Sequence, residues 1–81
     1  MSSQMNKARR AALESIKCMI ESVMDDLQTV LDEEEEARDN TPESLQETER
    51  YEQMEEACDS MEDIISSLED AIGSIDEIIN A

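Results

Sequence analysis

The sequence predicts an all-α fold: an antiparallel two-helix hairpin of the coiled-coil kind that dimerises into a four-helix bundle. Two long segments carry apolar residues at alternating steps of three and four, the spacing of one helix face that packs against a partner. Between them lies an acidic stretch with the only proline of the chain. With a single tyrosine, no Phe and no Trp, the core must be aliphatic. We expect one domain over residues 1–81, with helices at about 5–38 and about 43–80 and a turn at about 39–47.

The first helix has Ser2 or Ser3 as its candidate N-cap, because a serine hydroxyl accepts a hydrogen bond from the free amides of the first turn. Its apolar stripe is broader than a two-helix seam requires, since Met19, Met24 and Leu31 widen it on both sides. A broad stripe indicates contact with more than one neighbouring helix. The stripe itself consists of Leu13, Ile16, Ile20, Val23, Leu27 and Val30.

The stretch between the helices carries signals for both a stop and a start. Five successive carboxylates at positions 32–36 repel one another and oppose the dipole at a helix C-terminus. Asp39 and Asn40 suit the stop, because Asn tolerates the left-handed conformation that often ends a helix. Either of two helix starts then gives antiparallel neighbours joined by about 3 to 9 residues. These starts are Thr41 as N-cap before Pro42, and a capping box of Ser44 with Glu47.

The second helix repeats its apolar residues every seven positions in three rows. Three apolar rows per heptad are typical of a helix in a bundle. Two helices alone cannot bury faces of this width, so we predict a homodimer. The rows are Met54, Met61, Leu68 and Ile75; Ala57, Ile64, Ala71 and Ile78; and Tyr51, Cys58, Ile65, Ile72 and Ile79.

A chain reversal at Asn40-Thr41 brings the apolar positions of the two helices into phase. Glu34 and Glu47 are the acids at seam positions, and we expect them to mark the end of the core. In this register Leu27 faces Met54, Ile20 faces Met61, and Leu13 faces Leu68. We assign to the core or the dimer interface Leu13, Ile16, Ile20, Val23, Leu27, Met61, Ile65, Leu68, Ile72 and Ile75.

The chain carries 23 acidic against 6 basic residues, a net charge of −17. Such a charge disfavours direct binding to nucleic acid or to an anionic membrane and favours a basic partner. No apolar run is long enough for a membrane span or a signal peptide, so we expect a cytoplasmic protein. The basic residues gather at the amino end, where the hairpin is expected to place Lys7, Arg9 and Arg10 beside Glu69, Asp70, Asp76 and Glu77.

Residues suited to catalysis are scarce. The chain has no histidine, the commonest general base and zinc ligand, and its single glycine rules out a glycine-rich phosphate loop. Its acids do not follow the spacing of a calcium-binding loop. We therefore expect no enzymatic activity, no metal site and no cofactor. Cys18 and Cys58 lie too far apart along the hairpin for a disulfide, so we expect reduced thiols, with Cys58 as a small core residue.

The segment 36–57, EARDNTPESLQETERYEQMEEA, followed by LEDAIGSIDEI at 68–78, resembles small acidic helical hairpins encoded by bacterial phages and mobile elements. The resemblance covers roughly residues 30–80, and its recognisable part is NTPESLQ at the turn. It implies a bacterial host cell as the setting. Small acidic proteins in that setting sometimes inhibit host nucleic-acid enzymes, including restriction and CRISPR systems.

We predict a non-enzymatic interaction protein or inhibitor that binds a basic site on a bacterial protein in the manner of a nucleic-acid mimic. Arms of about 35 residues are about 50 Å long, the length of about 15 base pairs with about 30 phosphates. The alternative is a self-assembling helical bundle or scaffold whose acidity serves solubility. The carboxylates expected to bind the partner crowd the turn end: Asp32, Glu33, Glu35, Glu36, Glu49, Glu52, Glu55 and Glu56.

Overall fold

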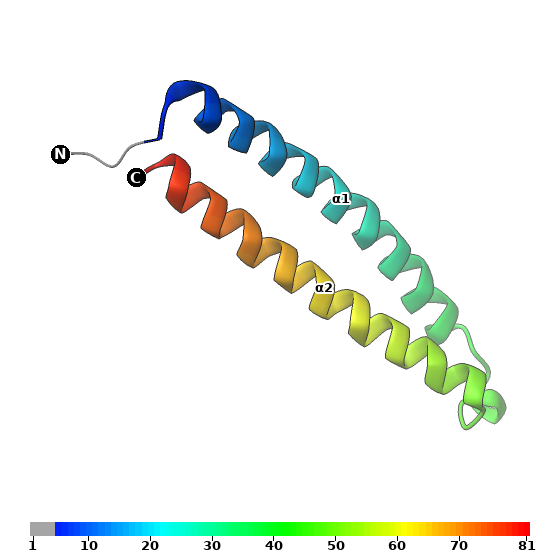
Figure 1. Cartoon of the computed structure of the whole chain (residues 1–81). Coiled ribbons are helices and arrows are strands. Elements are labelled where there is room, and N and C mark those ends of the chain that lie inside the picture. Colours follow the sequence, from blue (N-terminus) through cyan, green and yellow to red (C-terminus); the bar gives the residue numbers. More distant parts are fainter. Residues whose placement is uncertain (1–4) are drawn as a thin grey trace.

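The computed structural model describes residues 5–81 and shows two long helices joined by a turn (Figure 1). Helix α1 spans Lys7–Asp39 and α2 spans Glu49–Ile79, with a single 3₁₀ turn, η1, at Glu43–Leu45. The two long helices lie side by side in antiparallel directions, so the start of α1 and the end of α2 lie at the same end of a body measuring 65 × 18 × 13 Å. The prediction of an all-helical hairpin is confirmed.

The helix ends differ from the expected ones. The side chain of Asn6 caps α1 by accepting a 2.9 Å hydrogen bond from the amide of Arg9, while Ser2 and Ser3 lie outside the described residues. The hydroxyl of Thr48 caps α2 by accepting from the amide of Tyr51 at 3.3 Å. Neither predicted start of the second helix is used, because η1 occupies that part of the chain. At the end of α1, Asn40 has φ −87°, so no left-handed residue is needed to stop the helix.

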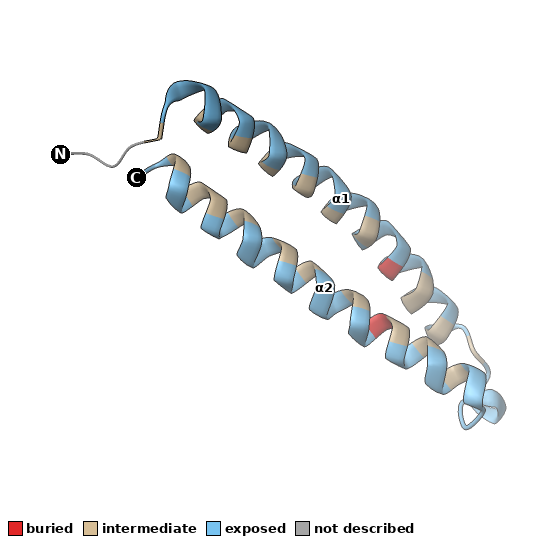
Figure 2. Cartoon of the chain, in the orientation of Figure 1, coloured by how far each residue is buried: buried red, intermediate tan, exposed pale blue. Residues whose placement is uncertain are grey.

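The packing seam follows heptad positions a and d of both helices, and in Figure 2 the residues coloured as buried or intermediate lie along the facing edges of the two helices. Within the described chain only Leu31 and Cys58 are fully buried. The other seam residues are half-buried. On α1 these are Leu13, Lys17, Ile20, Met24 and Leu27, and on α2 they are Met54, Met61, Ile65, Leu68, Ile72, Ile75 and Ile79.

Three residues of the predicted stripe do not face α2. Ile16, Val23 and Val30 are exposed over 40–54% of their surface. The seam instead runs through the residue that follows each of them in the chain, Lys17, Met24 and Leu31. These three residues therefore do not pack in the seam between α1 and α2, and the assignment of Ile16 and Val23 to the core or the dimer interface stays a prediction about a dimer.

The register also differs from the expected one. The Lys17 ammonium lies 2.8 Å from the Asp76 carboxylate, and the Thr41 hydroxyl lies 3.9 Å from the sulfur of Met54. Met54 thus meets Thr41, two heptads beyond the Leu27 that the sequence pattern paired with it. Because the chain reverses after Pro42 and not at Asn40-Thr41, the core does not end at Glu34. The half-buried Glu34, Arg38 and Thr41 continue the seam, and Glu47 is exposed outside both long helices.

Candidate interaction surfaces

Lys17 is a cation placed inside the apolar seam. Its ammonium bridges the helices by donating to Asp76 at 2.8 Å and also lies 3.7 Å from Glu14 of its own helix. The hydrogen bond to Asp76 raises the pKa of Lys17 above its ordinary value. A polar residue at an a position specifies how two helices align, because other alignments leave its charge without a partner.

The other amino-end cations do not form the predicted pairs. Within residues 5–81, the ion pair that joins the two long helices is the one made by Lys17. Lys7 and Arg10 instead border a shallow hollow together with Ile79 and Asn80. The expected contacts of Lys7, Arg9 and Arg10 with Glu69, Asp70, Asp76 and Glu77 are therefore not formed.

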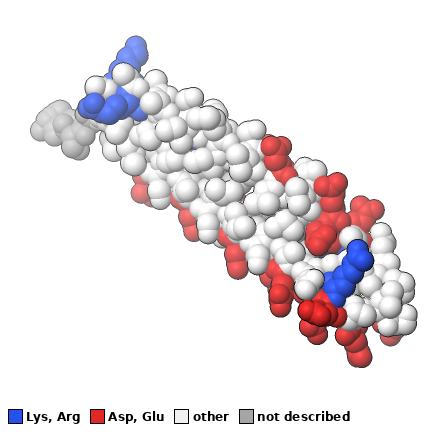
Figure 3. Space-filling view, turned by 45° about the vertical axis from the view of Figure 1, so that its right-hand side comes forward, with Lys and Arg blue, Asp and Glu red and all other residues white. Residues whose placement is uncertain are grey.

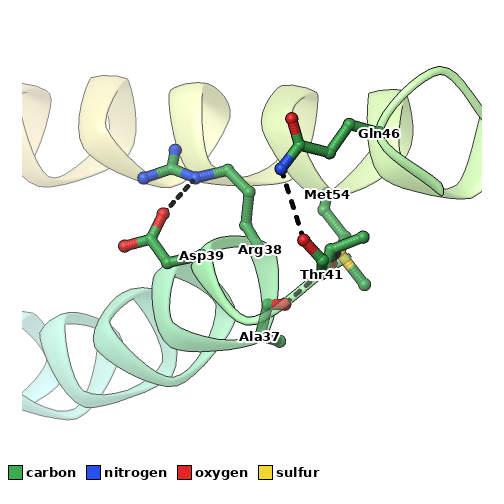
Figure 4. A network of polar contacts seen from close by, with 6 residues as sticks. All are labelled: Ala37, Arg38, Asp39, Thr41, Gln46 and Met54. Carbon is green, nitrogen blue, oxygen red and sulfur yellow. Dashed lines mark hydrogen bonds and ion pairs between the residues drawn. The ribbon is translucent and has the colours of Figure 1, made fainter. Parts of the chain in front are cut away.

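A polar network holds the turn end in place (Figure 4). The Thr41 hydroxyl donates to the carbonyl of Ala37 at 2.9 Å, and the Gln46 amide donates to the carbonyl of Thr41 at 3.3 Å. Arg38 pairs with its neighbour Asp39 at 3.2 Å. These contacts fix the path of the chain between the helices. Next to them lies an open apolar hollow of about 400 Å³, lined by Pro42, Leu45, Tyr51 and Met54 among others.

The two cysteines occupy contrasting places, and neither is in a disulfide. Cys58 is fully buried in the seam near the turn, and this burial raises the pKa of its thiol, while the nearby Arg38 guanidinium opposes the rise. Cys18 is exposed and lies next to Lys17, towards the chain ends. The expected core role of Cys58 agrees with its burial.

This contrast predicts that one of the two thiols reacts in the folded protein. With an aromatic disulfide reagent at neutral pH, Cys18 should react at once, and Cys58 only as fast as the hairpin opens, because burial protects it and keeps it protonated. The absorbance of the product released from the reagent should show one equivalent of thiol that reacts fast and one that reacts slowly. The Cys18→Ser variant should retain only the slow phase, and a fast phase in that variant would contradict the burial of Cys58.

Carboxylates line one flank of the hairpin. Two antiparallel helices that pack through a and d are related by a twofold axis normal to their common plane, so equivalent heptad positions lie on the same face. The e positions, which directly follow the d row, therefore share one side of the seam. Seven of these eight residues are acidic, and we call the set the acidic flank: Glu14, Glu21, Gln28, Glu35, Glu55, Glu62, Glu69 and Asp76.

Figure 3 shows further acidic side chains along the outer edge of α2. Acidic side chains also gather around the turn end, and Lys and Arg side chains lie both at the end where α1 starts and among the acids of the turn end. Most of the flank carboxylates are exposed, and Glu35 and Asp76 are half-buried. Because Lys17 pairs with Asp76 and Arg38 lies near Glu35, two cations offset part of this charge, and the remaining carboxylates keep a negative field that attracts cations and basic surfaces.

The eight carboxylates predicted to bind a partner at the turn end occupy different faces of the hairpin. Glu35 and Glu55 belong to the acidic flank, whereas Glu33 lies on the other side of the seam. The remaining five are exposed on the outer surfaces of the helices: Asp32, Glu36, Glu49, Glu52 and Glu56. Sequence analysis did not single out Glu14, Glu21, Glu62 and Glu69 as a row, although their repeat at every seventh residue directly after an apolar row can be read from the sequence.

The described residues were also searched for a metal site and for a membrane-spanning helix. No three potential ligands among their Cys, Asp and Glu side chains are placed to hold a metal ion. None of the helices there has the length and apolar character needed to cross a membrane. Comparisons with protein-family models, with curated proteins and with solved structures give no match to this chain.

Proposed function

We propose that this chain is a non-enzymatic acidic interaction protein that binds a basic site on a nucleic-acid-binding protein and competes there with nucleic acid. The observation that carries the proposal is the acidic flank, where seven of eight positions are Asp or Glu on two rigid antiparallel helices. Helix α1 has 33 residues and so is about 50 Å long, which spans about 15 base pairs of duplex. In a basic groove that is shaped for a duplex, the acidic flank would place negative charge along the whole length of the groove.

The setting follows from the resemblance of the NTPESLQ turn to hairpins of bacterial phages and mobile elements. In that setting the target is a host nuclease of a restriction or CRISPR system in the bacterial cytoplasm. Such enzymes hold nucleic acid through Lys and Arg side chains that contact phosphates. An acidic helix pair offers carboxylates to the same side chains and needs no catalytic group.

The experiment is competition. A purified restriction or CRISPR nuclease, bound to a fluorescent duplex, is titrated with the hairpin, and release of the duplex is followed by anisotropy. Reversing three flank charges (Glu21→Lys, Glu62→Lys and Glu69→Lys) should weaken competition at least tenfold. The matched control reverses three charges on the outer surface near the turn (Glu36→Lys, Glu49→Lys and Glu52→Lys) and should retain most of it.

The pattern of losses distinguishes the alternatives. Equal weakening by both triple variants would show that only net charge matters and would contradict a site on the flank. Competition unaffected by either variant would contradict an acidic site altogether. Because binding through charges is screened by salt, competition by the unaltered chain should also decline between about 50 and 200 mM salt.

A second function is favoured by a different observation. Six large apolar side chains within the two long helices are exposed over 40–57% of their surface, and contiguous apolar surface of this kind is typical of an interaction site. They suit a self-assembling bundle in which two hairpins form four helices, with the acidic flank turned outward. Such a dimer is compatible with the first function and supplies it with a rigid, two-sided acidic body.

A further inference from the structure

The hairpin is thinly packed. Its two helices fully bury only Leu31 and Cys58 among the described residues. Much of the remaining apolar surface of the long helices stays open to solvent. The exposed large side chains there are Ile16, Met19, Val23, Val30, Ile64 and Ile78.

Five of these six side chains lie on one side of the hairpin. They occupy heptad position g, which directly precedes the a row of the seam, and the same twofold relation that gathers the e positions gathers the g positions on the opposite flank. We call this row of eight the apolar flank, and it contains no charged residue. Its members are Ile16, Val23, Val30 and Ala37 on α1, and Ala57, Ile64, Ala71 and Ile78 on α2.

The register set by the Lys17–Asp76 and Thr41–Met54 contacts arranges the apolar flank as four rungs. The rung nearest the chain ends has two large side chains, Ile16 and Ile78. The rung nearest the turn has two small ones, Ala37 and Ala57. Between them, Val23 pairs with Ala71 and Val30 with Ile64.

The rows outside these rungs keep the surface nearly uncharged. On α2 the next row outward is short and polar, with Ser60, Ser67 and Ser74, which allow another helix to approach closely. On α1 the next row contains Ala12 and Met19 and contributes two acids, Asp26 and Glu33.

We propose that a second copy of this chain covers the apolar flank, packed so that the turn of each hairpin lies against the chain ends of the other. The inference rests on the dimer named above and specifies its surface and its direction. In this arrangement the large Ile16/Ile78 rung of one copy meets the small Ala37/Ala57 rung of its partner. Pairing large with small fills the space between facing layers, whereas two Ala rungs placed together leave a void.

Charge supports the same direction. The chain-end pole carries Lys7, Arg9 and Arg10, and the turn pole carries an excess of acids. Turn-against-ends packing sets each basic pole beside the partner's acidic pole, while the opposite arrangement stacks two acidic turns. The g rows continue beyond the apolar flank with an exposed arginine at each end of the hairpin, Arg9 near the start of α1 and Arg50 near the turn. Both acidic flanks then face outward.

The available area is sufficient for a stable dimer. The broad face of the hairpin measures 65 by 18 Å. The apolar flank extends from residue 16 to residue 37 of α1, about 32 Å, so an interface of the standard size, roughly 800 Å² per partner, also covers the residues that adjoin the flank on this face. A twofold dimer closes on itself, so no apolar row is left for further growth.

The proposed dimer surface is tested by sedimentation, which measures the mass of the assembly at micromolar protein concentration. The unaltered chain should sediment as a dimer, and Ile64→Lys should dissociate it at least a hundredfold more readily while circular dichroism still shows helix. The matched control Ser66→Lys adds the same charge at an exposed position of α2 outside the apolar flank and should remain dimeric. A monomeric unaltered chain would overturn both the dimer and this inference. A dimer that withstands Ile64→Lys would overturn the surface alone.

The direction is tested independently, without altering the flank. Spin labels are attached to Ser44→Cys in a Cys18→Ser background, since Ser44 is exposed in the turn and Cys58 is buried. Turn-against-ends packing should give a label separation of about 40–50 Å in double electron–electron resonance, close to one helix length. A separation of about 10–20 Å would place the two turns together and overturn the proposed direction, whatever Ile64→Lys does.

Discussion

Replacing Leu31 with Asp is expected to unfold the hairpin. Leu31 is 4% exposed, and the register places it at the level of Met61, beside the region of the buried Cys58. The change removes a buried side chain and puts an unpaired carboxylate into the seam, a combined cost of more than about 3 kcal/mol. A hairpin with two fully buried residues has little stability to lose. Far-ultraviolet circular dichroism should show loss of most of the helical signal at 25 °C.

The neighbouring substitution Val30→Asp is the matched control. It adds the same charge one position away, but Val30 is half exposed and lies on the apolar flank instead of the seam. The hairpin should keep its helices while the dimer weakens. Helix loss that is equal in the two variants, at concentrations where the unaltered chain is monomeric, would contradict the seam described for α1.

The comparison of these two residues shows where sequence analysis failed. Two stripes fit the three-four spacing of α1, and they share Leu13, Ile20 and Leu27. The uncharged stripe, with Ile16 and Val23, is the more apolar of the two and was predicted as the seam. The structure uses the stripe that contains Lys17, because a lysine stem can lie along apolar neighbours while its ammonium reaches Asp76 at the edge.

The sequence could not determine the register of α1 against α2, and the reason here is different. A strict heptad repeat matches equally well when one helix slides by whole heptads, so Met54 is in phase with both Leu27 and Thr41. The length of the turn decides between them. That length depends on η1 and on the Thr48 cap, local features that compete closely with the starts at Thr41 and Ser44.

The helices themselves were predictable because their periodicity is long and uninterrupted. Sequence analysis also found the acidity but placed it at the turn. The sorting of acids and apolar residues onto opposite flanks requires the correct seam, because the flanks are defined relative to it. Once Lys17, Met24 and Leu31 define the a row of α1, Ile16 and Glu14 fall on opposite sides of the seam. The proposed partner surface and dimer surface both follow from that single assignment.

Lys17 is expected to contribute to stability in a way that depends on pH. Lys17→Glu places a carboxylate next to Glu14 and Asp76, so it should lower the thermal midpoint by about 5–10 °C at neutral pH. Lys17→Met keeps a similar length without charge and should match or exceed the midpoint of the unaltered chain, since apolar residues often replace ion pairs at no cost. A Lys17→Glu midpoint equal to that of the unaltered chain would contradict the inter-helix pair.

Alkaline titration separates the ion pair from other effects. The hydrogen bond to Asp76 raises the pKa of Lys17 above its ordinary 10.5, so the stability from this pair is fully present below pH 10.5 and is lost as pH rises through the folded-state pKa. Urea midpoints of the unaltered chain and Lys17→Met should therefore run parallel from pH 8 to about 10, then diverge as the unaltered chain weakens. Cys58 ionises in both proteins, so its effect cancels. If the two curves stay parallel to pH 11.5, Lys17 contributes no charge-dependent stability, and alignment of the helices must come from the turn alone.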